Sequence, residues 1–121
     1  MTQDGAPVLD PAVIAELRAA TGDDDEFIAE LIESYLAEGQ ENVDSLSAAA
    51  AESDLAVFGR AAHTLKSTSA TVGAMRLSEL CRGLEEAARN GRAEDLPGEA
   101  DRVQAAWLVT IAALAAAGLG S

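Results

Sequence analysis

The sequence predicts an all-α fold: an antiparallel up-and-down four-helix bundle with a short extra N-terminal helix packed across one end. Alanine and leucine abound, and aromatic residues make up only 3% of the 121 residues, a composition that favours helices over sheets. Apolar residues recur at spacings of three and four in four long segments joined by short connections, as in antiparallel bundles. We predict one domain over residues 1–121, with residues 1–9 as a flexible N-terminal tail.

The first two predicted helices begin at acidic residues. Asp10 provides an N-cap, Pro11 follows at the first helical position, and Gly22 ends this short helix. The run Asp23 to Glu26 then brings four carboxylates to the start of the next helix, where the helix dipole favours negative charge. The apolar spacing predicts one long helix from about Asp24 to Glu52.

Three further segments complete the predicted bundle. Gly39 could bend the long helix from Asp24 to Glu52, but the apolar pattern continues beyond it. After that helix, Ser53 and Asp54 cap a helix that ends near Gly73. The next helix spans about Ala74 to Asn90, and the last runs from about Asp95 to Ala117. The apolar positions expected to face inward in these three helices are Leu55, Phe58, Ala61, Leu65, Val72, Leu77, Leu80, Cys81, Leu84, Ala88, Val103, Trp107, Leu108, Ile111 and Leu114.

Composition argues against several classes of function. The net charge of −13 disfavours binding to nucleic acid or to anionic membranes, because both need clustered lysine and arginine. The most apolar stretch, Ala105 to Ala117, is too short to span a bilayer, and no signal peptide opens the chain. One histidine and one cysteine cannot build a metal site of four ligands or an internal disulfide. We therefore expect a cytoplasmic protein with no metal and no cofactor of its own.

The single histidine, His63, lies in a helical pattern but on the side opposite the predicted core. Each residue turns a helix by about 100°, so Phe58, Leu65 and Val72 point away from the imidazole. Its neighbours on the outer face are small or cationic: Gly59, Arg60, Lys66, Ser67 and Ala70.

This arrangement suits a nucleophile that attacks phosphorus. An imidazole has a large neutral fraction at neutral pH and needs no base to activate it. Lys66, one turn along, can place an ammonium against phosphoryl oxygens, and Arg60, one turn back, offers a second cation. The small side chain of Ser67 leaves room for a bulky partner to approach.

The stretch His63-Thr64-Leu65-Lys66-Ser67-Thr68-Ser69, followed by Val72-Gly73 and the helix from Leu77 to Glu85, resembles the histidine-containing phosphotransfer (HPt) domains of multistep two-component phosphorelays. The resemblance implies that His63 accepts the phosphoryl group and that Lys66 orients it. Ser67 stands where the family most often has glycine. In some members a polar residue and an arginine on the following helix border the site, and these align here with Glu85 and Arg89.

The resemblance also implies the partners. Response-regulator receiver domains would donate the phosphoryl group to His63 and take it away, and would link the protein to a sensor histidine kinase. The receiver would supply the magnesium ion, so that this chain acts as a stoichiometric phosphocarrier rather than an enzyme.

Other interpretations stay open at this point. The chain could be an HPt-like bundle that binds receivers as an adaptor without carrying phosphate, an acidic module that mimics nucleic acid, or a hydrolase. Glu85 and Arg89, four residues apart, would form an ordinary surface ion pair in the simplest interpretation. Cys81, placed among leucines, is expected in the core.

Overall fold

The computed structural model describes residues 6–92 and 95–119, which contain five α-helices and no strand. The helices are α1 (Pro11–Ala20), α2 (Asp25–Ala51), α3 (Leu55–Thr71), α4 (Met75–Arg89) and α5 (Leu96–Ala116). The prediction of an all-α fold is confirmed, and each helix boundary lies within two residues of the predicted one. Of the predicted tail, residues 1–5 lie outside the described part, whereas the carbonyls of Ala6 and Pro7 both accept hydrogen bonds from Arg76, each at 2.9 Å.

Aspartate side chains begin four of the helices. The caps are made by Asp10, Asp24, Asp54 and Asp95, each of which accepts a hydrogen bond from a backbone N–H two or three residues later at 2.9–3.1 Å. Such a cap stabilises a helix by about 1 kcal/mol. Ala74, which precedes α4, makes no side-chain cap, so α4 depends more on its packing against α3.

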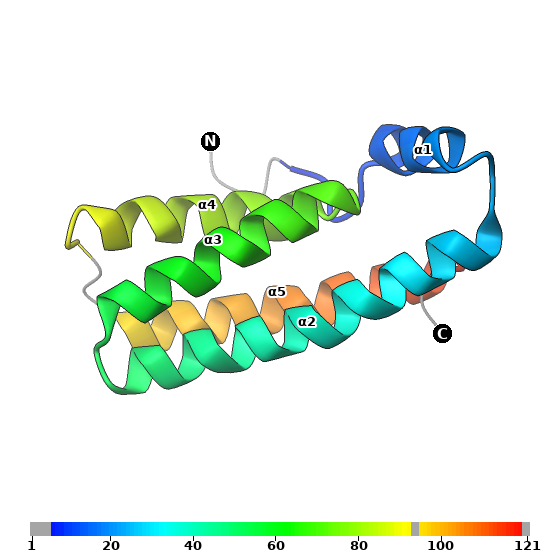
Figure 1. Cartoon of the computed structure of the whole chain (residues 1–121). Helices are drawn as coiled ribbons and strands as arrows, with labels where there is room; N and C mark the ends of the chain where they lie inside the picture. The colour runs from blue at the N-terminus through cyan, green and yellow to red at the C-terminus, as the bar shows by residue number, and fades with distance from the viewer. Residues whose placement is uncertain (1–5, 93–94, 120–121) are drawn as a thin grey trace.

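The four long helices contact one another in a ring. α2 packs against α3 and α5, α3 packs against α4, and α4 packs against α5. In Figure 1, α3 and α4 lie together, and α2 and α5 form a second pair. α1 lies at one end of these helices, where the N–H of Asp10 donates to the carbonyl of Gly73 at 2.8 Å. Gly73 adopts a φ of 82°, a conformation that favours glycine at this turn.

Gly39 allows α2 and α5 to approach closely, and the prediction of one long helix through this position is confirmed. A Cβ at Gly39 would overlap the indole ring of Trp107, and α2 continues as one helix through this position. Trp107 is fully buried, and its Nε1 donates to Oε1 of Gln40 at 2.9 Å. The rings of Tyr35 and Trp107 pack edge to face, with their centroids 5.5 Å apart.

The core agrees with most of the predicted inward positions. The largest fully buried side chains include Trp107, Phe58, Ile32, Leu46, Leu65, Leu77 and Leu114. Cys81 is also fully buried, as predicted. Leu108 is the exception: it is 56% exposed, because it lies on the side of α5 that faces away from α2 and α4. None of the described helices is both long enough and apolar enough to cross a membrane.

Candidate functional site

His63 projects from α3 into solvent, as its place in the helical pattern predicted. The imidazole side chain is 58% exposed, whereas Ala62 and Leu65, its neighbours along the chain, are fully buried. Leu65 and Phe58 anchor the opposite face of α3 in the core. The ring is therefore carried by a helix whose rotation is determined by its buried face.

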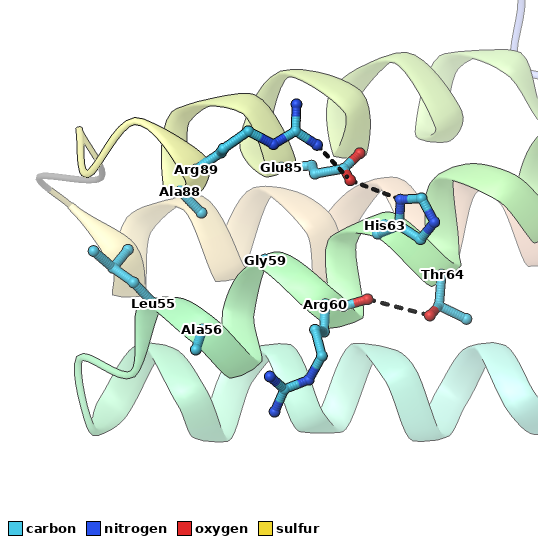
Figure 2. A pocket seen from close by; sticks show the side chains of 9 residues that line it. All are labelled: Leu55, Ala56, Gly59, Arg60, His63, Thr64, Glu85, Ala88 and Arg89. Atoms are coloured by element: carbon cyan, nitrogen blue, oxygen red, sulfur yellow. Dashed lines mark hydrogen bonds and ion pairs between the residues drawn. The ribbon is translucent and has the colours of Figure 1, made fainter.

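Glu85, on α4, joins the histidine to two cations. Its Oε2 lies 2.6 Å from Nδ1 of His63 and accepts a hydrogen bond from Arg89 at 3.1 Å, as Figure 2 shows. Its Oε1 accepts a hydrogen bond from Nζ of Lys66 at 2.7 Å. The Glu85 side chain is only 12% exposed. One carboxylate thus contacts three positively charged or protonatable groups.

The predicted ion pair between Glu85 and Arg89 is present, but it is a minor part of this arrangement. The sequence interpretation missed the contacts of Glu85 with His63 and Lys66, which lie 22 and 19 residues away. No local spacing rule relates residues so distant. The alignment of Glu85 with the polar residue that borders the site in some family members was the only signal for this contact.

The ionisation of Glu85 determines which ring nitrogen of His63 is free. The hydrogen bond from Lys66 is the main cause that lowers the pKa of Glu85, and burial opposes it. An ionised carboxylate only accepts hydrogen bonds, so Nδ1 of His63 must carry the proton and donate. In the neutral ring, the lone pair is then on Nε2. The exposed ring thus offers Nε2 as its nucleophilic atom.

Small residues determine the distance between α3 and α4 beside the site. A Cβ at Gly59 would lie 3.3 Å from Cβ of Ala88, so the helices are near their closest approach here. On the other side of the site, the hydroxyl of Ser78 donates to the carbonyl of Lys66 at 2.9 Å. These contacts bring Glu85 within hydrogen-bond distance of His63.

A groove of about 420 Å³ runs along α3 and α4 next to His63. Its lining is apolar at Leu55, Ala56, Gly59 and Ala88 and polar at Arg60, His63, Thr64, Glu85 and Arg89. The groove therefore continues the surface that carries the imidazole.

The other two predicted site residues lie beside His63 without touching it. In Figure 2 the guanidinium of Arg60 points away from the imidazole, and it makes no ion pair within the described residues. Ser67 is exposed one helical turn beyond His63. The hydroxyl of Thr64 donates to the carbonyl of Arg60 at 3.2 Å and is therefore directed toward the backbone of α3.

Two further polar residues of α3 make hydrogen bonds of different kinds. Thr68 donates to the carbonyl of Thr64, one turn back, at 3.0 Å. Ser69 instead pairs with the hydroxyl of Tyr35 at 2.7 Å in the core, because it lies on the buried side of α3. Within residues 6–92 and 95–119, no three His, Cys, Asp or Glu side chains are grouped so that they could bind a metal ion.

The fold and the site define a class of protein: a small helical domain that presents one imidazole, fixed by a carboxylate on the neighbouring helix. The Hpt domain family matches residues 30–117, and the chain belongs to this family. The structure is similar to that of histidine-containing phosphotransfer protein B (HptB) from Pseudomonas aeruginosa PAO1, with a TM-score of 0.78 and 29% identity, over 88% of this chain and 90% of that one. No curated protein matches the sequence. The chain therefore has a phosphotransfer role of the kind that Hpt domains perform in phosphorelays.

Proposed function

We propose that this protein accepts a phosphoryl group on His63 from the aspartyl phosphate of one receiver domain and passes it to another. The observation that carries this proposal is the contact of Nδ1 with Glu85, which in the neutral ring places the lone pair on Nε2 of an exposed imidazole. We also propose that α2 to α5 form an antiparallel up-and-down bundle, which is supported by their ring of contacts and by the short turns between them. The proposed partners imply a cytoplasmic location.

The transfer step follows from the chemistry of Nε2. Its lone pair attacks the phosphorus of the aspartyl phosphate, an N–P bond forms, and the bond from phosphorus to the aspartate oxygen breaks. The aspartate leaves as a carboxylate. The ring, which keeps its proton on Nδ1, gains positive charge, and the Glu85 carboxylate at 2.6 Å offsets that charge. Such a step depends mainly on positioning and charge neutralisation.

Lys66 is the proposed cation for the phosphoryl oxygens. Its ammonium has three N–H donors, one of which is directed to Glu85, and its side chain is 28% exposed. The remaining donors are available to an incoming phosphoryl group on the adjacent ring. Ser67 would keep the approach open, and Arg60 would contribute only if its long side chain turned toward His63. The receiver would supply the magnesium ion.

The test is phosphoryl uptake from a receiver labelled with radioactive phosphate. His63→Gln should leave the helical circular dichroism and the melting temperature unchanged and should abolish acid-labile label on the chain. Label retained on that variant would remove His63 from the mechanism. Lys66→Ala should slow transfer in both directions with little change in receiver binding, and an undiminished rate would contradict its assigned role.

The alternative function is a receiver-binding adaptor that carries no phosphate. Ser67 favours it, because a hydroxymethyl group one turn from His63 adds bulk where a receiver would approach. Uptake of one phosphoryl group per chain would exclude the adaptor, whereas receiver binding without uptake would establish it. Ser67→Gly separates the two further, because it should speed transfer only if transfer occurs.

A further inference from the structure

α5 carries apolar residues on two opposite sides. The inner side includes Val103, Trp107 and Leu114, which are all buried. The outer side, which we call the outer seam, consists of Ala105, Leu108, Ala112 and Ala115, which are all exposed. The outer seam repeats at spacings of three, four and three, the pattern by which helices pair in coiled coils.

An apolar outer face is unusual for a helix at the surface. Such helices normally turn charged residues to water, and a helix that is apolar all round is usually covered all round. Among the helices of the described residues, α5 packs mainly against α2 and α4. Leu108 is 56% exposed and its neighbour Val109 is 50% exposed. A hollow of about 160 Å³ opens beside the seam, and its lining includes Ala105 and Val109 of α5 together with Val8 and Arg76.

The outer seam is also free of charge in a strongly acidic chain. The sequence contains 21 acidic and 8 basic residues, yet no charged residue follows Arg102. A second copy of this chain, at −13, would be repelled by most of the surface, and the repulsion would be smallest at the seam. Two copies of this uncharged face can meet without repulsion between them, as in an isologous contact about a two-fold axis.

We propose that the outer seam pairs with that of a second copy, with the two α5 helices antiparallel. In this arrangement Leu108 of each copy packs over Ala112 of the other, and Ala105 packs over Ala115, so a large side chain faces a small one in both central layers. A parallel pair would stack Leu108 on Leu108 and would bring the acidic residues Glu99 and Asp101 of both copies together. The small alanines allow the helices to approach closely.

The pairing leaves the phosphotransfer site free. His63 is on α3, which packs mainly against α2 and α4, whereas the seam is on the side of α5 turned away from those helices. A dimer through α5 would therefore present two imidazoles to solvent. A receiver bound at the seam would not reach His63, so the seam does not serve the phosphotransfer step itself.

Analytical ultracentrifugation tests the pairing. The seam from Ala105 to Ala115 is about 15 Å long at 1.5 Å per residue, which makes a small interface and a weak dimer. We expect the weight-average mass to rise toward that of a dimer between about 10 µM and 1 mM protein, and to rise further with added salt, which screens the repulsion between acidic copies. A monomer across that range at both low and high salt overturns the proposal.

A matched pair of substitutions tests the location. Ala112→Glu places a charge in the centre of the seam and should raise the dissociation constant at least about thirtyfold. Ala37→Glu makes the same change at an exposed alanine of α2. It should leave the dissociation constant of the dimer within about threefold of that of the unchanged chain, because one added charge on each copy increases the repulsion only slightly. Equal effects of the two substitutions would mean that the seam is not the interface.

Cysteine cross-linking tests the direction of the helices. A Leu108→Cys chain mixed with an Ala112→Cys chain should give mainly the mixed disulfide, because these positions face each other in the antiparallel pair; native Cys81 is fully buried and does not compete. A preference for disulfides between identical chains would overturn the antiparallel arrangement. Phosphoryl uptake by Ala112→Glu should be unchanged, so failure of the dimer and failure of the proposed function are separate outcomes.

Discussion

Replacing Glu85 with glutamine removes the negative charge behind the imidazole while it keeps the size of the side chain. The amide oxygen of glutamine can still accept from Nδ1 of His63, so the ring orientation and the free lone pair on Nε2 are kept. What is lost is a charge-assisted hydrogen bond at 2.6 Å. We therefore expect Glu85→Gln to reduce the rate of phosphoryl transfer while the fold is unchanged.

The size of the effect follows from the hydrogen bond that changes character. A hydrogen bond to a charged group contributes about 1.5–3 kcal/mol, and one between neutral groups contributes about 0.5–1.5 kcal/mol. The difference, about 1–1.5 kcal/mol, corresponds to a decrease of about tenfold in rate, because in the proposed step the ring becomes positive as the N–P bond forms. The phosphorylated state loses the same stabilisation, so its equilibrium level should fall as well.

Two effects oppose this loss, and both are smaller. Removing a carboxylate reduces its repulsion of the incoming phosphoryl group, but Lys66 and Arg89 already balance that charge. Releasing Lys66 from Glu85 frees a cation, but an ion pair near the surface contributes only about 0–1 kcal/mol. We therefore expect the net effect of Glu85→Gln to be a lower rate of phosphoryl transfer.

The assay is rapid-quench measurement of phosphoryl transfer from a labelled receiver, at receiver concentrations that saturate the chain. Glu79→Gln is the matched control, because Glu79 is an acid on the same helix that pairs with Arg82 rather than with the site. A rate for Glu85→Gln equal to that of Glu79→Gln would refute the role assigned to the carboxylate.

Three further predictions concern stability and the core. Gly39→Ala should destabilise the protein by about 1–3 kcal/mol, because the added methyl overlaps the buried indole on α5, whereas Gly83→Ala, with nothing within 4 Å, should stabilise it by about 0.5–1 kcal/mol; urea unfolding that shows the same sign for both would contradict this. Tyr35→Phe should cost about 1–3 kcal/mol, because the Ser69 hydroxyl loses its buried partner, and adding Ser69→Ala should recover part of that loss. Burial raises the pKa of the Cys81 thiol from 9.0 and that of the Tyr35 phenol from 10.0, each to about 12, and the folded state therefore favours their protonated forms. Stability from these groups is fully present below pH 9.0 and falls as pH rises toward 12, so the unfolding free energy should decrease over that window, less steeply in Cys81→Ala; an equal slope in both proteins would contradict the burial argument.

Much of the fold could be predicted because its determinants are local. Four helices begin at an aspartate that accepts a hydrogen bond from a backbone N–H within three residues, namely Asp10, Asp24, Asp54 and Asp95. The residues next to each of these helix starts are therefore enough to predict it. The outward direction of His63 depended only on the rotation of one helix. Leu108 was misplaced because an apolar residue in a helical pattern indicates burial only when a neighbouring helix covers that side.

By itself the sequence determined that the chain is helical, where the helices begin and end, and that its only histidine stands on an exposed face beside a lysine. These properties depend on hydrogen bonds and side chains within one or two turns of a helix. Only the tertiary structure decided that Glu85 approaches His63 and Lys66, that Gly39 accommodates Trp107, and that Ser69 pairs with Tyr35. The physical reason is that contacts between helices depend on how α2, α3, α4 and α5 are shifted along one another, and that shift results from the packing of the whole core.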